Sequence, residues 1–357
     1  MGDTKPIRQG EELNAENLAE FLRDKLGDGD IEISQFPGGS SNLTYCVRIG
    51  ATEYVLRRPP FGNQVKSAHD MSREFNVLDK LSKVYAPAPK PLIYCDDESV
   101  IGSEFYLMER RTGLIIRGKL SEPFASADGL TLENSPELRR KICESFIENL
   151  VQLHSIDYKK IGLENLGKPA GYAVRQVEGW TKRYFNAKTD EHLELEKAIE
   201  WLNTNIPDSH GATLVHNDYK FDNIMLNPND LTEIIAVLDW EMTTIGEPLM
   251  DLGTSLGYWM SKEAGEQMLS MPFNPRVLME NISRAELVEI YAEKSGRDVS
   301  GILFYYVFGT FKIAVIAQQI YFRFAKGFTN DKRFATFNHF VNALGKIALF
   351  AIESGKI

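Results

Sequence analysis

The sequence predicts an α+β protein of two lobes, in which a small sheet-rich lobe is followed by a larger, mostly helical one. A length of 357 residues allows two lobes that each bury a core. The first 108 residues hold short β-branched and aromatic runs between turn signals. Longer stretches after residue 113 show the apolar spacing of helices. A composition of 43% hydrophobic and 25% charged residues is typical of a globular protein.

Charge and hydropathy exclude several classes of partner. A formal net charge of −10 argues against nucleic-acid binding, which needs a basic patch, and gives no support for binding to an anionic membrane. The three cysteines are far apart and lack metal-ligand spacing, which indicates reduced thiols and a cytoplasmic location. Residues Met1–Leu13 hold no apolar run, so no secretory signal is expected. The apolar stretch Ile302–Phe324 contains Lys312 and Arg323 and is predicted to be a buried helix rather than a membrane span.

The first lobe opens with a predicted amphipathic helix, Asn14–Leu26, and a short strand, Ile31–Ile33. A turn rich in Gly and Ser then leads into a second strand, Leu43–Ile49. The backbone N–H groups of such a turn can bind a triphosphate, although most turns of this composition only join the strands of a hairpin. The candidate phosphate-binding residues are Gly38, Gly39, Ser40, Ser41 and Asn42.

The third predicted strand, Glu53–Arg58, ends in two arginines whose side chains point to opposite faces of a sheet. The next predicted helix, Ala68–Ser82, places Glu74 beside an apolar stripe, where an unpaired carboxylate is costly. Arg57 is the expected partner of Glu74. Arg73 on the same helix is the alternative, although adjacent helical residues do not face each other. The simpler interpretation is that the strand arginines are solvated.

Two further strands, Leu92–Cys95 and Phe105–Met108, complete the predicted first lobe. The stretch Glu109–Gly113 then changes abruptly to polar composition and is predicted to be a hinge. Backbone groups of an extended hinge can pair with an adenine ring. The candidate nucleotide-binding residues at this point are Met108, Glu109 and Arg110.

The second lobe is predicted to span residues 114–357, after a first lobe of residues 1–108 and a hinge of residues 109–113. Its first helix begins at Ser135-Pro136, a cap followed by proline at the first helical position, and ends near His154. That histidine is interpreted as a packing residue rather than a catalytic one. The segment Lys168–Glu200 mixes aromatic and cationic side chains, and with the helices after Arg284 it is expected to form the wall of a substrate site.

The stretch between Ala212 and Asp239 holds the densest group of chemically active residues. Three short apolar runs alternate there with a polar loop, His216–Asn223, and a turn. This pattern is expected to bring Asp218, Asn223 and Asp239 to one edge of a small sheet. Carboxylate and amide oxygens are the ligands that Mg²⁺ prefers, so the stretch predicts a magnesium site.

The spacing of Asp218, Lys220 and Asn223 matches the kinase catalytic loop, His-x-Asp-x-Lys-x-x-Asn, and Asp239 follows in Leu-Asp-Trp-Glu. With these motifs the chain, from about Gln35 onward, resembles the aminoglycoside phosphotransferase and choline kinase branch of the protein-kinase-like fold. It looks most like the phosphotransferase domains that occur fused to acyl-CoA dehydrogenases. One departure from the kinase pattern is that Trp-Glu replaces the usual Phe-Gly after the second Asp.

The resemblance implies a bilobal protein-kinase-like fold and a role for each residue. Arg57 stands where kinases have a phosphate-binding lysine, and its pair with Glu74 would mirror the strand–helix ion pair of kinases. Arginine can still bind phosphate through two N–H groups. Asp251 would hold backbone amides of the catalytic loop. The proton acceptor would be Asp218, the phosphate-stabilising cations Lys220 and Arg57, and the Mg²⁺ ligands Asn223 and Asp239.

The implied function is an ATP- and Mg²⁺-dependent kinase that phosphorylates a hydroxyl group of a small molecule. The domains that this chain resembles occur fused to acyl-CoA dehydrogenases. This fusion suggests a hydroxyacyl acceptor or its CoA thioester, and a functional link to an acyl-CoA dehydrogenase. Clustered cations would attract such an anion and repel an aminoglycoside, but a solvated helix face explains these charges as well, and the net charge of −10 argues against the attraction. The alternatives are an aminoglycoside or choline-type kinase, and a nucleotide-binding pseudokinase. The oligomeric state is not indicated. The cations are Arg110, Arg111, Arg117, Lys119, Arg175, Lys182 and Arg183.

Overall fold

The chain divides into two compact units. A computed structural model describes residues 3–37, 42–61, 70–117, 132, 134–209, 211–259 and 275–357. Unit 1 holds residues 1–112 together with 236–241, and unit 2 holds residues 113–235 together with 242–357. The predicted turn residues Gly38, Gly39, Ser40 and Ser41, and also Lys119, lie outside the described residues.

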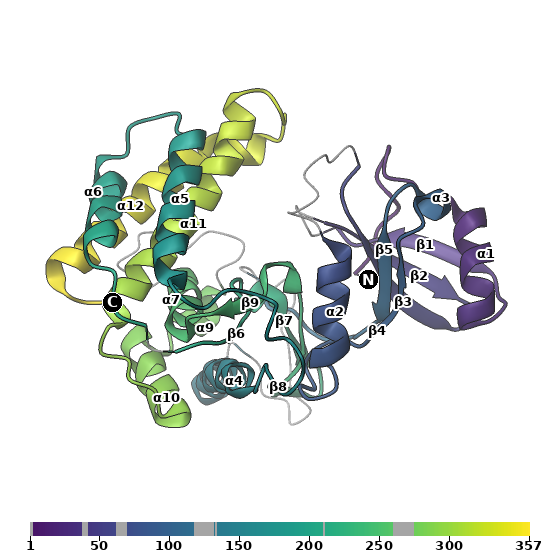
Figure 1. Ribbon diagram of the computed structural model, residues 1–357, viewed down its shortest axis with the longest axis horizontal. Coiled ribbons are helices and arrows are strands. Elements are labelled where there is room, and N and C mark those ends of the chain that lie inside the picture. Colours follow the sequence, from purple (N-terminus) through teal and green to yellow (C-terminus); the bar gives the residue numbers. More distant parts are fainter. Residues whose placement is uncertain are drawn as a thin grey trace. The chain divides into compact units, whose positions relative to one another are not determined.

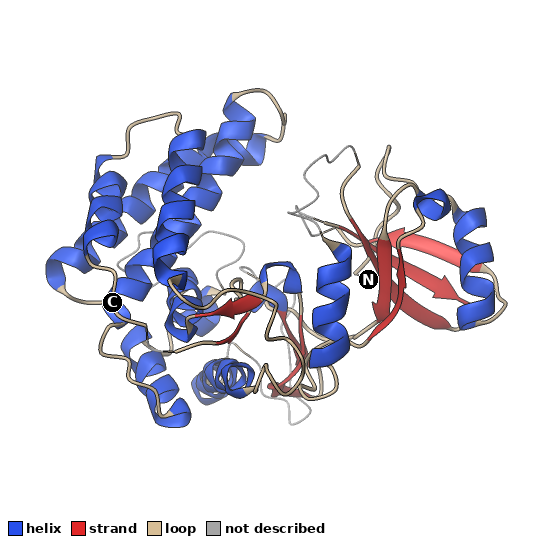
Figure 2. Ribbon diagram, in the orientation of Figure 1, coloured by secondary structure: helices blue, strands red, loops and turns tan. Residues whose placement is uncertain are grey.

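The described part of unit 1 is built on an antiparallel sheet of five strands in the order β1-β2-β3-β5-β4 (Figure 2). The Val-, Ile- and Tyr-rich runs of the sequence form these strands, because such side chains pack well on a pleated surface. The strands are β1 (Ile31–Gln35), β2 (Leu43–Ile49), β3 (Thr52–Arg58), β4 (Pro91–Cys95) and β5 (Phe105–Glu109).

Helices α1 (Ala15–Leu26) and α2 (Met71–Leu81) lie on opposite faces of this sheet, and the short α3 (Glu98–Ile101) lies near α1 (Figure 1). The side chain of Asn14 caps α1 by accepting a hydrogen bond from the Asn17 N–H at 3.0 Å. Asp70 caps α2 in the same way, so the helix begins at Met71, and the predicted start at Ala68 lies outside the described residues.

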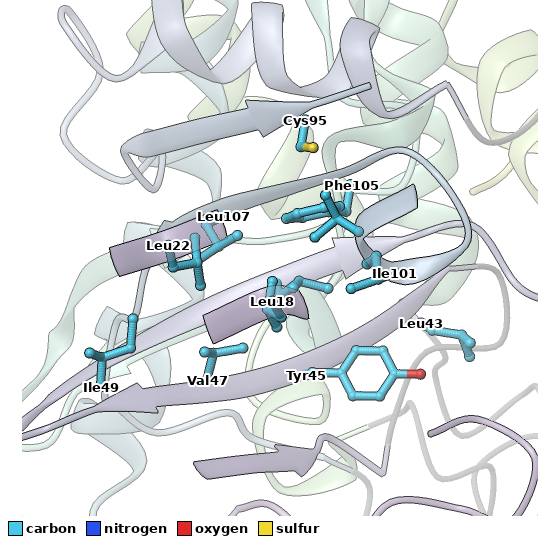
Figure 3. Packing of buried hydrophobic residues seen from close by; sticks show 12 residues of the cluster. Leu18, Leu22, Leu43, Tyr45, Val47, Ile49, Cys95, Ile101, Phe105 and Leu107 are labelled. Atoms are coloured by element: carbon cyan, nitrogen blue, oxygen red, sulfur yellow. The ribbon is translucent and has the colours of Figure 1, made fainter. Parts of the chain in front are cut away.

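The core of unit 1 lies between α1 and the sheet (Figure 3). Alternate residues of the strands face it, as the period of two in a strand requires. Leu18 and Leu22 of α1 pack there against Val47 of β2 and against Phe105 and Leu107 of β5, and all five are almost completely buried. The opposite face of the same strands is directed towards α2, and it carries Arg57 and Tyr106.

Unit 2 is mostly helical, with two small antiparallel strand pairs among its described residues. β6 (Thr213–Val215) pairs with β9 (Thr244–Gly246), and β7 (Ile224–Asn227) pairs with β8 (Asp230–Val237). The helices are α4 (Pro136–Ser155), α5 (Tyr172–Ala187), α6 (Leu193–Thr204), α7 (Pro248–Tyr258), α9 (Arg276–Met279), α10 (Arg284–Ser295), α11 (Ile302–Ala325) and α12 (Phe337–Ser354).

Helix α11 is central to unit 2 and packs against α5, α6, α7 and α12. By length and composition this described helix could cross a membrane, but 78% of its most apolar window is buried inside the protein. The prediction of a buried helix is therefore confirmed. The predicted α4 is also confirmed, since Ser135 caps it, Pro136 begins it, and its apolar stripe is buried.

Glycines set the close crossing of α7 and α11. A Cβ atom at Gly309 of α11 would overlap the carbonyl group of Gly253 and the Cα of Thr254 on α7. Since these neighbours are backbone atoms, they cannot move without separating the helices. We expect Gly309→Ala to lower the free energy of unfolding by about 2 to 3 kcal/mol, measured by urea denaturation.

The matched control is Gly179→Ala in α5. A Cβ at Gly179 would meet only the guanidinium of Arg183 at 3.6 Å, an ordinary contact. Alanine also favours the helix over glycine by about 0.5 to 1 kcal/mol. The control should therefore gain stability. Equal losses in both variants would show that the crossing has no special need for glycine.

Candidate active site

In unit 1, Arg57 of β3 and Glu74 of α2 form the predicted ion pair, with Arg57 Nε 3.4 Å from Glu74 Oε1. The same guanidinium also donates a hydrogen bond of 2.9 Å to Asp239 Oδ1, and it lies 3.9 Å from Glu241 Oε2. One buried arginine thus contacts three carboxylates, one from α2 and two from the segment 236–241. The interpretation of Arg57 as a solvated residue is wrong, because only 10% of its side chain is exposed.

Burial and charge act against each other in this cluster. Burial raises the pKa of the Glu74 carboxyl, and the neighbouring Arg57 offsets only part of that rise. Burial also disfavours the positive charge of Arg57, but Glu74 and the carboxylates beyond it hold the arginine's pKa well above its usual value. Arg57 therefore stays charged.

Arg58 points to the other face of the sheet, as predicted. Its guanidinium donates to the carbonyl oxygens of Pro59 at 3.0 Å and Ile101 at 2.9 Å, and it stacks over the ring of Phe61. No carboxylate pairs with it among the described residues. Arg58 therefore ties the sheet to α3, while Arg57 faces the acidic cluster.

The segment 236–241 is bound to unit 1 by both backbone and side chains. The Val237 N–H donates to the Pro87 carbonyl at 2.8 Å, and the buried Trp240 packs edge-on against Tyr85. Asp239 has the left-handed backbone angle φ of 67°, which is unusual for a residue other than glycine. This sharp turn directs its carboxylate to Arg57 and allows Trp240 to turn into the core.

Glu241 is a residue of this cluster that the sequence analysis did not single out. Its carboxylate accepts a hydrogen bond of 2.7 Å from the Asn42 side chain, and its carbonyl accepts one of 3.2 Å from Arg73. Asn42 is the one candidate of the Gly/Ser turn that lies in the described part of the chain, and here it contacts an acid. The replacement of Phe-Gly by Trp-Glu was the signal that could have identified Glu241.

The predicted hinge residues are engaged in contacts that the sequence did not indicate. The Glu109 N–H donates to the Lys90 carbonyl at 2.9 Å. The Arg110 guanidinium forms ion pairs with Asp3 and Glu53. Met108 is buried within β5. The N–H of Glu109 is used by Lys90, which precedes β4, so pairing of the hinge with a base would have to use other backbone groups.

In unit 2, Asp218 lies in the loop after β6 and holds three side-chain contacts. Its Oδ2 accepts hydrogen bonds from Lys220 Nζ at 2.6 Å and Asn223 Nδ2 at 3.0 Å. Its Oδ1 accepts a longer one, 3.3 Å, from the Tyr258 hydroxyl at the end of α7. The carboxylate is therefore fixed mainly through one oxygen, and the other keeps capacity for a further donor. Tyr258 was not predicted.

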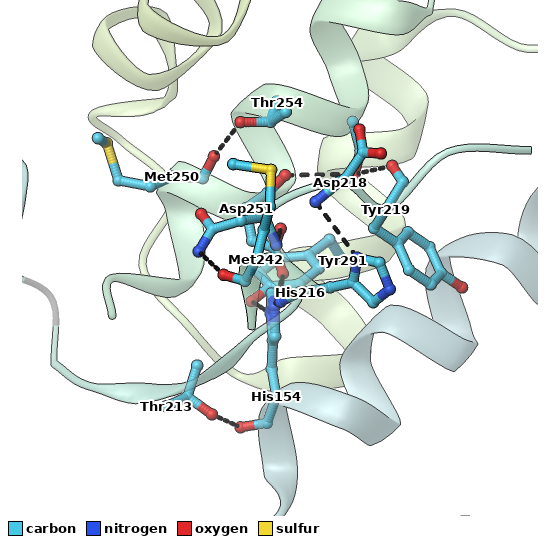
Figure 4. Close-up of polar contacts among 12 residues, drawn as sticks. His154, Thr213, His216, Asp218, Tyr219, Met242, Met250, Asp251, Thr254 and Tyr291 are labelled. Atoms are coloured by element: carbon cyan, nitrogen blue, oxygen red, sulfur yellow. Dashed lines mark hydrogen bonds and ion pairs between the residues drawn. The ribbon is translucent and has the colours of Figure 1, made fainter. Parts of the chain in front are cut away.

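Asp251 of α7 anchors the loop that leads to Asp218 (Figure 4). Its carboxylate accepts hydrogen bonds from the His216 N–H at 2.6 Å and the Asn217 N–H at 2.7 Å. His154 Nε2 lies 3.2 Å from the same carboxylate, and its Nδ1 contacts the Tyr291 hydroxyl at 2.8 Å. The prediction that Asp251 holds backbone amides is confirmed, and so is the structural role of His154.

Asp251 stays ionised although it is completely buried. Burial alone would raise the pKa of its carboxyl, but the hydrogen bond and charge of His154 and the N–H of His216 outweigh burial and lower that pKa. A buried carboxylate that accepts several N–H groups is stabilised in this way. The loop before Asp218 is therefore held by a charged anchor.

Comparison with known proteins identifies the family. Residues 32–271 match the phosphotransferase enzyme family. The chain belongs to that family. Acyl-CoA dehydrogenase family member 11 from Homo sapiens is 35% identical to this phosphotransferase over 97% of the chain and 44% of the relative. The chain thus spans less than half the length of that relative.

Solved structures share the fold of this phosphotransferase. A protein provisionally described as an aminoglycoside phosphotransferase, from Ralstonia eutropha JMP134, is 29% identical, with a TM-score of 0.79 over 96% of this chain and 99% of that one. An aminoglycoside phosphotransferase in complex with AMP-PNP and hygromycin B is 14% identical, with a TM-score of 0.57 over 95% and 99% of the two chains. The predicted kinase-like α+β fold is confirmed, and enzymes of this kind phosphorylate hydroxyl groups.

The donor atoms of the phosphotransferase fit the chemistry of Mg²⁺. Both hydrogen bonds that Asn223 Nδ2 donates go to Asp218, at 2.9 and 3.0 Å, so the amide oxygen of Asn223 takes part in neither. Asp239 supplies a carboxylate that is 32% exposed. Among the described residues there is no cluster of three or more His, Cys, Asp or Glu that could hold a metal. Amide and carboxylate oxygens of these kinds suit Mg²⁺, which keeps water and phosphate among its ligands.

The cations expected to attract an anionic acceptor are divided by the structure. Besides Arg110, Arg111 is also paired, with Glu109, and Arg175 donates to the carbonyls of Lys168 and Ala170. Arg110 and Arg111 are therefore not available as predicted, because each is paired with a carboxylate. The other described members of the predicted set, Arg117, Arg175, Lys182 and Arg183, are exposed, and Arg117 lies 3.8 Å from Asp222.

Proposed function

We propose that this phosphotransferase transfers the γ-phosphate of ATP to a hydroxyl group of an acyl compound or of its CoA thioester, with Mg²⁺ bound. The observation that supports it best is the set of contacts at Asp218. Lys220 and Asn223 hold one carboxylate oxygen by hydrogen bonds of 2.6 and 3.0 Å, and Asp251 holds the preceding backbone. A carboxylate fixed in this way suits a proton acceptor in phosphoryl transfer.

The roles of the residues follow from their charges. Asp218 would orient the acceptor hydroxyl and take its proton, and Lys220 and Arg57 would offset negative charge on the transferring phosphate. Asn223 and Asp239 would hold Mg²⁺, which supplies charge neutralisation at the phosphates. Met108, Glu109 and Arg110 remain candidates for binding the nucleotide. The Glu109 N–H would not take part, because it is bonded to the Lys90 carbonyl.

The acceptor is inferred from α5, α11 and α12. Helix α11 contains no Asp or Glu, α5 contains only Glu178, and α12 contains only Glu353, whereas the neighbouring α6 carries Glu194, Glu196 and Glu200. A site for a polycationic aminoglycoside needs several acids, whereas α5, α11 and α12 carry few of them, and Lys182 and Arg183 of α5 are exposed. The relative that shares 35% identity carries acyl-CoA dehydrogenase in its name, which supports an acyl acceptor.

The test is a direct comparison of acceptors. Hydroxyacyl-CoAs, the free hydroxy acids, choline and kanamycin-like amines are incubated with labelled ATP and Mg²⁺, and transfer of label is measured for each. We expect transfer to hydroxyacyl compounds and none to the amines. Transfer to amines or choline alone would overturn the acyl acceptor and keep the kinase. A magnesium-dependent thermal shift by ATP with no transfer to any acceptor would favour a pseudokinase.

A further inference from the structure

A buried lysine lies beneath the catalytic loop. Lys312 is in the middle of α11, and only 2% of its surface is exposed. Its Nζ donates a hydrogen bond of 2.5 Å to the carbonyl oxygen of Asn217, the residue before Asp218. Trp180 of α5 covers it from another side, with its ring centre 5.5 Å from Nζ. A buried cation is costly to a fold and is usually offset by specific partners.

The residue that Lys312 contacts has a strained backbone. Asn217 has a φ angle of 67°, in the left-handed region that costs a residue other than glycine about 1 kcal/mol or more. Its N–H donates to Asp251, and its side chain contacts the Tyr172 hydroxyl at 3.0 Å and the Met242 carbonyl at 3.1 Å. Lys312 completes this set by holding the carbonyl.

The carbonyl matters because it belongs to the peptide bond that leads into Asp218. Rotation of this peptide plane would move the Asp218 N–H, which donates to His216 Nδ1 at 3.2 Å, and would turn the carboxylate. Tyr172, Met242 and Asp251 hold the other groups of Asn217, so the carbonyl is the group that Lys312 controls.

The charged groups facing Lys312 come from each neighbouring element. Burial lowers the pKa of Lys312 to about 8, Asp218 of the loop and Asp251 of α7 oppose this, and Lys220 and Arg183 add to it. The ammonium form is thus present at neutral pH and is lost as the pH rises above about 8.

We propose that Lys312 is a positioning residue for phosphoryl transfer, whose ammonium group fixes the Asn217 carbonyl and through it the orientation of the Asp218 carboxylate. This inference rests on the proposed function. It assigns a catalytic need to a buried side chain that contacts the backbone before Asp218.

The variant Lys312→Met tests the proposal, because methionine has a similar volume and removes the buried charge. Methionine removes the cost of burying the ammonium group, but it also leaves the Asn217 carbonyl without its donor, and these two effects on stability oppose each other. We expect the melting temperature to change little, kcat to fall by about ten- to a hundredfold, and KM for ATP to change less than about twofold. An unchanged kcat would overturn the proposal.

The matched control is Gln318→Met, on the same helix. Gln318 is also buried and donates to a backbone carbonyl, that of Ala187 at 2.8 Å, but on α5 rather than on the catalytic loop. It should alter stability without altering kcat. Equal losses of kcat in both variants would indicate general loosening of α11 and contradict a specific role for Lys312.

The pH profile of the wild-type protein provides a measurement that does not depend on the variant's folding. We expect wild-type kcat to fall as the pH rises through about 8 to 9, and Lys312→Met to lack this fall. A wild-type kcat that stays flat to pH 9.5, or an identical fall in the variant, would overturn the proposal. If the wild type transfers phosphate to no acceptor, it is the proposed function that fails.

Discussion

Asp218→Asn is expected to reduce phosphoryl transfer by about 10²- to 10⁴-fold while leaving binding of magnesium-ATP intact. The amide keeps the shape of the carboxylate and one acceptor oxygen for Lys220, but it cannot take a proton from the acceptor hydroxyl. The measurements are the initial rate with labelled ATP and the magnesium-dependent thermal shift produced by ATP. Retained transfer would show that Asp218 is not the proton acceptor.

The neighbouring acid provides the control for this prediction. Asp222 lies in the same loop, and burial raises the pKa of its carboxyl. The hydrogen bonds that hold the Asp218 carboxylate come from the side chains of Lys220, Asn223 and Tyr258, and Asp222 has no part in them. Asp222→Asn should therefore keep most of the activity. If Asp222→Asn loses as much transfer as Asp218→Asn, the loss is not specific to Asp218, and Asp218 is not identified as the proton acceptor.

Arg57→Met is expected to destabilise unit 1 by about 3 to 5 kcal/mol at pH 8, because it leaves the buried Glu74 without a cation. Burial already raises the pKa of Glu74, and Arg57 now opposes that rise. Without Arg57 the folded pKa moves further above the unfolded value of about 4.3. The loss should therefore be small below about pH 4.5 and grow as the pH rises through the folded pKa.

Urea denaturation at pH 5 and pH 8 measures this difference. Arg57→Lys should recover part of the stability, because the charge remains while the two-pronged geometry is lost. Arg58→Met is the control, since Arg58 donates to the Pro59 and Ile101 carbonyls, and its loss should not vary with pH in this range. A pH-independent loss for Arg57→Met would mean that Glu74 does not depend on its charge.

Local sequence patterns predicted the elements and the pairs that a pattern can encode. The strand Leu43–Ile49 has the expected bounds, and the opposite directions of Arg57 and Arg58 follow from the strand period alone. The contacts of Asp251 with His216 and Asn217 followed from the resemblance. These features depend on spacing within one or two neighbouring elements, which the sequence displays directly.

Contacts between distant segments could not be predicted in this way. Arg110 was assigned to a nucleotide, but its partners are Asp3 and Glu53, which lie 107 and 57 residues away in sequence. In the sequence, Lys312 indicated only that its helix is not a membrane span. Its contact with Asn217, which lies 95 residues away, gave no signal there. Which of several carboxylates or carbonyls a cation meets is decided by packing, and a single sequence contains no signal for that choice.

The position of the segment 236–241 affects how the protein can assemble during synthesis. Unit 1 lacks this segment until residues 113–235 have been translated, although its other residues emerge first. At about 5 to 20 residues per second, the delay is on the order of ten seconds. During that time Arg57 has no Asp239 to bind and Tyr85 has no Trp240 to pack against. A fragment ending at Thr112 should therefore be a poor folding unit, and the nascent amino-terminal sheet is a natural client for chaperones.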